Sequence, residues 1–379
     1  MTRTEGWPGR IALMVAHCAG MVDLVALPVW VGTLISSYQL DPQQAGGLVT
    51  LFLVGAVASS LFFAPRFTRI RGRTAASVGF AVAALAFFGV SQTTSYTTMG
   101  ALHALAGGAA GCGLTFTHGT IGRSVNPHRL FAIVGMALGV FAILFLGATP
   151  KLVALSGGAT LFRVFAGVML VGALVATLAF PEPEQAGAVS SERGAAFDAR
   201  VWFAIAGISC MAFVQAMTFS FVERIGIERG FGLDAVTGVL IALGLVNLLP
   251  APLAALLERR WSANTVVLVG PLAQAALALV ITHAQGFAPY AVASALFVGV
   301  MIFTHTFAFG LVARLDPTGR ALAATPAMLM VGAATGPVLG GTFVKAMGYG
   351  SIGVAAVVIA AVALTSFSRA RLEPSPMQA

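Results

Sequence analysis

The chain has 379 residues, of which 58% are hydrophobic and only 9% are charged. A soluble domain carries about a quarter charged residues, so this composition excludes an ordinary soluble protein. The net charge of +8 comes from arginines spread along the whole chain, which argues against nucleic-acid binding, because such a surface gathers its basic residues on one face.

Twelve apolar stretches follow one another along the chain, separated by short polar connections. Each is close to the length that crosses the hydrocarbon core, about 20 residues of helix. The stretches are continuously apolar, whereas barrel strands alternate over about 10 residues, so we predict helices. The predicted spans are 11–37, 45–65, 74–91, 97–122, 130–149, 159–180, 200–222, 235–257, 263–283, 288–312, 321–344 and 350–367.

Basic residues in the connections predict the orientation of these spans. With both termini in the cytoplasm, sixteen of the 21 Lys and Arg residues fall on the cytoplasmic side, as the positive-inside rule requires. The compact chain and its 19 arginines against two lysines lead us to expect a multi-pass protein of a bacterial inner membrane. The first span is too long for a cleavable signal.

The second half repeats landmarks of the first. Leu40-Asp41 recurs as Leu233-Asp234 after 193 residues, and Phe116-Thr117-His118 recurs as Phe303-Thr304-His305 after 187; Lys151 recurs as Lys345 after 194. Duplicated helical bundles are typical of secondary transporters, whose sites lie near mid-membrane. We therefore predict an all-α membrane protein of two pseudo-symmetric six-helix bundles. Their expected bounds are 1–180 and 199–379, with a cytoplasmic linker at 181–198.

At this point the chain resembles the major facilitator superfamily over nearly its whole length. That family marks the loop between helices 2 and 3 with Gly-x-Leu-x-Asp-Arg-x-Gly-Arg, and residues 65–73 keep the closing Gly72-Arg73 but hold Pro65, Phe67 and Arg69 at the Gly, Leu and Asp places. The second-half loop offers Glu258-Arg259. The resemblance implies that these loop residues influence the conformation of the protein, although the family's acid is missing from the first loop.

Predicted helix 11 contains the sequence GAATGPVLGG at 332–341. It matches a pattern that drug antiporters of this family carry in helix 5, and helix 5 of this chain lacks it. We therefore interpret Gly336 and Pro337 as giving close helix packing and a bend, with a role in the direction of transport as the alternative.

The resemblance implies that helices 1, 4, 7 and 10 line a central cavity, so their polar residues are the candidate substrate and proton pathway. Asp23 is the only acid well inside a predicted span, where a charge costs roughly 2.5–3.5 kcal/mol. It could carry a proton, or it could make a structural hydrogen bond or ion pair. The full candidate set is His17, Asp23, His103, His118, Gln215, Thr304 and His305, with Gln215 as the repeat counterpart of Asp23.

The histidines can be interpreted either as titrating groups or as structural hydrogen-bonding residues. His118 and His305 occupy matching places near a predicted cytoplasmic gate, and histidine titrates near neutral pH; each could instead be an interhelical hydrogen-bonding residue. The same alternatives hold for His17 and His103. Glu223 ends helix 7 beside Arg224, and we expect a solvated ion pair there.

These residues lead us to expect a secondary active transporter of a small organic solute, working by alternating access and coupled to protons. No arginine is expected at mid-membrane, which favours a neutral, zwitterionic, cationic or hydrophobic solute. His17 and Met21 lie one turn apart and leave copper transport as an alternative, and a non-transporting sensor is another. The three cysteines stand alone. We expect a monomer with no metal, cofactor, nucleic-acid partner or enzymatic activity.

Overall fold

The computed structural model describes residues 4, 6–181, 197–258, 260–316, 321 and 325–371. All regular structure in these residues is helical. The chain divides into two compact units, Met1–Glu192 and Arg193–Ala379. Most of the linker predicted at 181–198 lies outside the described residues, so the predicted domain bounds stay a prediction.

Twelve helical segments of the described chain are long and apolar enough to cross a membrane, which confirms the twelve predicted spans. Their ends differ from the prediction in several places, and three of these extend the span by more than three residues. The first span begins at Trp7, the fifth continues to Ser156 and the seventh continues to Glu228. Gly157 follows the end of the fifth span, and its φ of +83° is a conformation that glycine adopts without strain.

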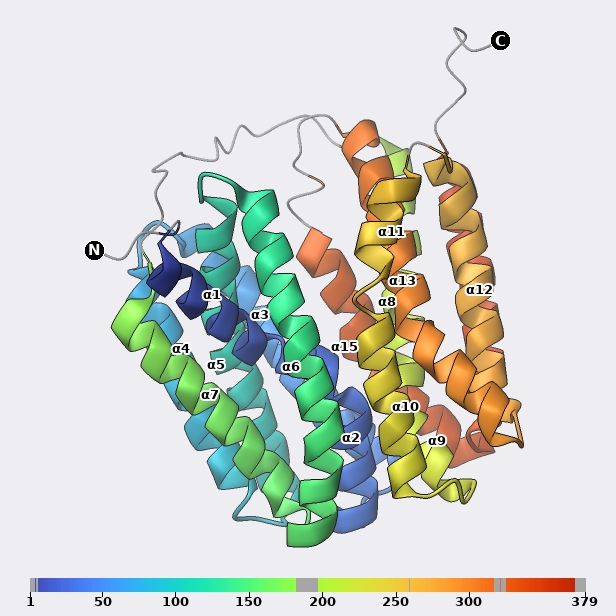
Figure 1. Cartoon of the computed structure of the whole chain (residues 1–379), viewed down its shortest axis with the longest axis horizontal. Helices are drawn as coiled ribbons and strands as arrows, with labels where there is room; N and C mark the ends of the chain where they lie inside the picture. Colours follow the sequence, from blue (N-terminus) through green and yellow to red (C-terminus); the bar gives the residue numbers. More distant parts are fainter. Residues whose placement is uncertain are drawn as a thin grey trace, which may run out of the picture. The chain divides into compact units, whose positions relative to one another are not determined.

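Within its described residues, the first unit has seven α-helices and one short 3-10 helix (Figure 1). They are α1 (Trp7–Gly20), α2 (Val22–Tyr38), α3 (Pro42–Phe63), η1 (Ala64–Arg66), α4 (Gly72–Val90), α5 (Tyr96–Gly122), α6 (Pro127–Ser156) and α7 (Ala159–Ala179). Asp41 starts α3 through a capping box with Gln44, in which each side chain accepts from the other's backbone N–H. The repeat landmark Leu40-Asp41 thus marks a helix start.

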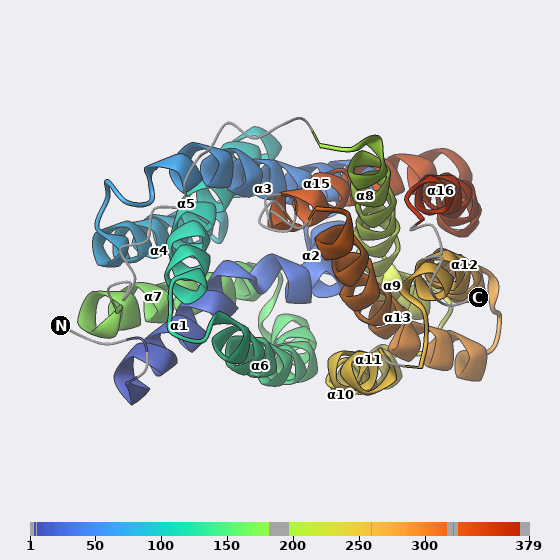
Figure 2. The same cartoon turned by 90° about the horizontal axis from the view of Figure 1, so that it is seen from above.

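Small residues bring α5 close to α3, its neighbour in Figure 2. A Cβ atom added to Gly111 of α5 would lie 2.7 Å from the Cα atom of Ala56 in α3, so a larger residue cannot fit without moving the backbone. Lipid tails are as apolar as leucine, and membrane helices therefore associate through such close packing.

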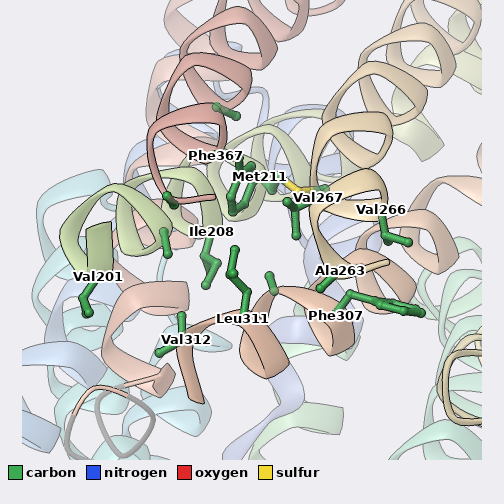
Figure 3. Packing of buried hydrophobic residues seen from close by; sticks show 14 of the residues in the cluster. Val201, Ile208, Met211, Ala263, Val266, Val267, Phe307, Leu311, Val312 and Phe367 are labelled. Carbon is green, nitrogen blue, oxygen red and sulfur yellow. The ribbon is translucent and has the colours of Figure 1, made fainter. Parts of the chain in front are cut away.

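The described part of the second unit contains eight α-helices. They are α8 (Ala199–Phe219), α9 (Val222–Glu228), α10 (Leu233–Val246), α11 (Pro250–Leu257), α12 (Ala263–His283), α13 (Phe287–Leu315), α15 (Thr325–Met347) and α16 (Gly350–Arg369). Figure 3 shows part of its apolar core, in which Ile208 of α8, Leu311 of α13 and Phe367 of α16 point toward one another and are fully buried.

The first helix of each unit is broken, although continuous helices were predicted. The break between α1 and α2 is at Met21, with φ −108° and ψ 20°; the break between α8 and α9 ends at Phe221, with φ −111° and ψ 1°. Each break creates a new helix start inside a membrane span, where backbone N–H groups lack helical partners. Asp23 and Glu223 lie in the first turns of α2 and α9.

Candidate functional site

A pair of histidines joins α1 to α5 in the first unit. The Nδ1 atom of His17 lies 3.0 Å from the Nε2 atom of His118, and the ring centroids are 5.1 Å apart. A neutral imidazole has one donor and one acceptor nitrogen, so one ring donates to the other. The pair can accept one further proton and keep this bond, whereas a second proton would place two N–H groups against each other.

Asp23 lies beyond the helix break that follows His17. Its carboxylate interacts with the backbone N–H groups of Asp23 itself and of Leu24, at the positive end of α2. The positive end of a half-helix stabilises an ionised carboxylate, and discontinuous membrane helices place such ends at the binding sites of secondary transporters. The break therefore places His17 and Asp23 on either side of one irregular segment.

His103 is held in a fully satisfied pair. The Nε1–H group of Trp30 donates to its Nε2 atom at 3.3 Å, and its Nδ1 atom lies 2.7 Å from the carbonyl oxygen of Met99. Nε2 is thus the acceptor and Nδ1 the donor, which fixes a neutral tautomer. The side chain is fully buried and stacks on Trp30, so these contacts favour the structural reading of His103.

The candidate residues of the second unit each contact a different partner. Gln215 accepts a hydrogen bond from Nε2 of Gln274 at 3.4 Å. The Thr304 hydroxyl donates to the carbonyl oxygen of Val300. His305 stacks on Phe309, and its Nε2 atom is buried without a hydrogen-bond partner among the described residues.

The loop after α3 is anchored to its own unit by the two retained motif residues. The Arg73 guanidinium donates from Nε and Nη2 to the carbonyl oxygen of Phe180, at 3.2 and 3.1 Å, and so ties the start of α4 to the end of α7. Gly72 is buried beside the Phe180 ring, whereas the Arg69 side chain is exposed.

Phe67 is an anchor of this loop that the sequence did not single out. Its ring stacks on Phe116 of α5 with centroids 5.4 Å apart, and the Arg123 guanidinium lies 4.5 Å from its centroid. The sequence feature that could have identified Phe67 is its position at the Leu place of the loop motif. An apolar contact is thus present there although the acid of the motif is not.

The remaining loop and helix 11 candidates have separate environments. Glu258 is exposed at the end of α11, and Arg259 lies outside the described residues. Pro337 is buried within α15. A Cβ atom added to Gly336 would lie 2.7 Å from the Cβ atom of Ala216 in α8, so this glycine lies at a close approach of α15 to α8.

The predicted ion pair of Glu223 with Arg224 is wrong. Arg224 bonds Glu228 at 2.8 Å, and the Oε2 atom of Glu223 is buried without a hydrogen-bond partner among the described residues. Adjacent residues point in different directions around a helix, while residues four apart lie on one face. The spacing of Arg224 and Glu228 was the sequence signal for the pair that forms.

Three side chains, those of Arg224, Glu228 and Tyr349, are joined by hydrogen bonds at the end of α9. The Tyr349 hydroxyl donates to Oε1 of Glu228 at 3.1 Å; burial and the Glu228 carboxylate raise the pKa of Tyr349 above its usual range. No group of three His, Cys, Asp or Glu side chains in the described part of the chain could hold a metal ion.

Solved structures of low sequence identity share this fold. A bacterial homologue of the human lysosomal transporter Spinster, inward-facing and unoccupied, is 16% identical with a TM-score of 0.73, and the alignment covers 98% of this chain and 100% of that one. A D-xylose-proton symporter is 12% identical with a TM-score of 0.73 over 96% of both chains. The nucleoside transporter NupG, as a point mutant, is 13% identical with a TM-score of 0.74 over 95% and 98%.

The sequence itself carries the family assignment. Comparison with curated proteins gives no significant match. The model of the Major Facilitator Superfamily matches residues 12–318, which is most of the chain and includes both broken helices. The chain belongs to the major facilitator superfamily.

Proposed function

We propose that this protein is a proton-coupled secondary active transporter that moves a small organic solute across a bacterial inner membrane by alternating access, with both termini in the cytoplasm. The observation that carries the coupling is the bond between His17 and His118. It joins two helices of one bundle, and its protonation changes both the charge and the contact between them.

The coupling follows from the cost of charge inside a membrane span. A neutral histidine pair is compatible with a closed, dry environment, whereas the protonated pair carries a charge that favours water or a counter-charge. Protonation therefore biases the bundle toward whichever conformation hydrates or neutralises α1 and α5. Asp23, beyond the break, is the nearest acid along the chain that can exchange a proton with that pair.

The class of solute follows from the basic residues. In the four helices that the resemblance to the family implies around the cavity, Arg and Lys lie near the ends of the spans, at Arg10, Arg200, Arg224 and Arg314. A tightly bound phosphate or carboxylate calls for a guanidinium or ammonium partner. We propose a neutral, zwitterionic, cationic or hydrophobic solute. The symporter and nucleoside transporter of like fold give precedents for uncharged solutes.

Purified protein in proteoliposomes tests this function. A thermal-shift screen against metabolites and drugs first supplies a ligand, and its flux is then followed with and without an imposed pH gradient. We expect the gradient to drive accumulation and an uncoupler to abolish it. Ligand binding without flux in either direction would instead identify a transporter-like sensor.

A further inference from the structure

Residues at equivalent places in the two repeats form different kinds of pair. Leu40-Asp41 and Leu233-Asp234 are 193 residues apart, and the same offset relates Trp30 to Glu223. Phe116-Thr117-His118 and Phe303-Thr304-His305 are 187 residues apart, and that offset relates His103 to Tyr290. In each unit, the residues at these places lie close together. Trp30 donates to His103, while Tyr290 donates to the carbonyl oxygen of Val222, beside Glu223, at 2.8 Å.

The two pairs differ in how their polar atoms are satisfied. In the first unit the Trp30 N–H group and both nitrogens of His103 have partners. In the second unit the Oε2 atom of Glu223 is buried and has none among the described residues. A buried charge without a partner is costly, and that cost is removed when the carboxylate binds a proton.

The neighbouring cation, Arg224, attracts the Glu223 carboxylate electrostatically but makes no hydrogen bond to its buried Oε2 atom. The Arg224 guanidinium is bonded to Glu228, and Arg229 donates to the carbonyl oxygens of Ile281, Thr282 and Ala284 at the end of α12. Tyr290 is the group that interacts electrostatically with Glu223 from α13. The titratable and charged groups on and around α9 are Arg224, Glu228, Arg229, Asp234 of α10, His283 of α12, Tyr290 of α13, and Tyr349.

The Tyr290 hydroxyl has a second polar neighbour on its own helix. Ser294 lies one turn from Tyr290 on α13, and its hydroxyl interacts with that of Tyr290. A hydroxyl group can donate to a carboxylate or accept from a carboxylic acid. The Tyr290 hydroxyl therefore lies among the carbonyl oxygen of Val222, Ser294 and the Glu223 carboxyl, and it can change its acceptor.

We propose that Glu223, with Tyr290 as its hydrogen-bonding partner, is a proton-binding site of the second unit. The protonated carboxyl is neutral and leaves the Tyr290 hydroxyl on the carbonyl of Val222. On release of the proton, the Tyr290 O–H turns from that carbonyl to the carboxylate, which is the stronger acceptor. A role for this step in coupling rests on the proposed transport function, but the binding of the proton does not.

Infrared difference spectroscopy of the purified protein tests the site without a substrate. The pH is stepped, and the C=O stretch of a protonated carboxyl is followed in wild type, Glu223→Gln and Glu228→Gln. Glu228→Gln is the matched control, because it removes an ion-paired acid of the same helix. We expect one carboxyl band to be lost in Glu223→Gln and kept in Glu228→Gln. In Tyr290→Phe the pH midpoint of that band moves upward, because a donor to the carboxylate is gone.

Unchanged carboxyl bands in Glu223→Gln would overturn the proposal. Glutamine has nearly the size of glutamate, and thermal unfolding of each variant shows whether its fold is retained. Should Glu223→Gln not fold, the Tyr290→Phe spectrum decides, since an unmoved midpoint contradicts the site. Flux is measured separately. If Glu223→Gln loses the band but the wild-type protein transports nothing, the transport function is refuted and the proton site stands.

Discussion

His17 and His118 share a hydrogen bond of 3.0 Å although 101 residues separate them in the chain. The bond joins Nδ1 of His17 to Nε2 of His118, so each histidine can be replaced by the amide side chain whose polar atom lies at the same place. Asparagine places a polar atom near an Nδ1 position and glutamine near an Nε2 position, so each amide can keep the contact without accepting a proton.

The first prediction uses that match. We expect His17→Asn combined with His118→Gln to keep a folded protein and to make flux nearly independent of pH between about 5 and 8, the range in which histidine ordinarily titrates. The control is His283→Gln, which removes an exposed histidine. Flux is measured in proteoliposomes at a series of pH values. An unchanged pH profile in the double variant would return both residues to a structural role.

Local patterns predicted the spans, and tertiary contacts decided the site. Hydropathy is a property of each stretch, so twelve windows sufficed to find twelve helices. The breaks were missed although Gly20 directly precedes Met21 and Ser220 directly precedes Phe221, because glycine is also frequent inside uninterrupted membrane helices. The His17–His118 contact depends on the packing of α1 against α5, which no sequence spacing encodes.

The second prediction concerns the anchor of the loop after α3. We expect Arg73→Gln to destabilise the protein by about 1 kcal/mol, since it loses charge-assisted bonds to the carbonyl of Phe180 from a half-buried side chain. Arg69→Gln, which changes an exposed arginine of the same loop, should stay within about 0.5 kcal/mol of wild type. Thermal unfolding in detergent measures both. Equal loss of stability in the two variants would contradict the anchor.

The third prediction concerns the packing of α15 on α8. We expect Gly336→Ala to cost about 1–3 kcal/mol, because the new methyl group meets the backbone and side chain of α8. Gly310→Ala in α13 is the control: a Cβ there meets nothing within 4 Å, so the better helix propensity of alanine should leave stability equal or higher. Unfolding temperatures that rise for both variants would show that α15 can move away without cost.

The fourth prediction concerns orientation. In a background without native cysteines, a cysteine at Gln92 should react with a membrane-impermeant maleimide in intact cells, and one at Ser191 should not. The reason is the excess of arginine in the connections on the Ser191 side. Permeabilised cells provide the control, because both sites should then react. Reaction at Ser191 alone in intact cells would reverse the proposed topology.

The last prediction separates coupling from transport at Asp23. Its carboxylate lies in the first turn of α2, where the backbone N–H groups of the half-helix hold it. Asp23→Asn keeps the size and an acceptor oxygen for those groups but cannot exchange a proton. We therefore expect accumulation driven by a pH gradient to vanish while exchange of solute down its own gradient survives.

The two assays, run on the same proteoliposomes, give Asp23 three distinguishable outcomes. Loss of accumulation with exchange retained places the proton on Asp23. Accumulation at the wild-type level means that the His17–His118 pair or Glu223 is sufficient, and contradicts a coupling role for Asp23. Loss of exchange as well, with an unchanged unfolding temperature, assigns Asp23 to solute binding, since an uncharged asparagine would then have removed an attraction for the solute itself.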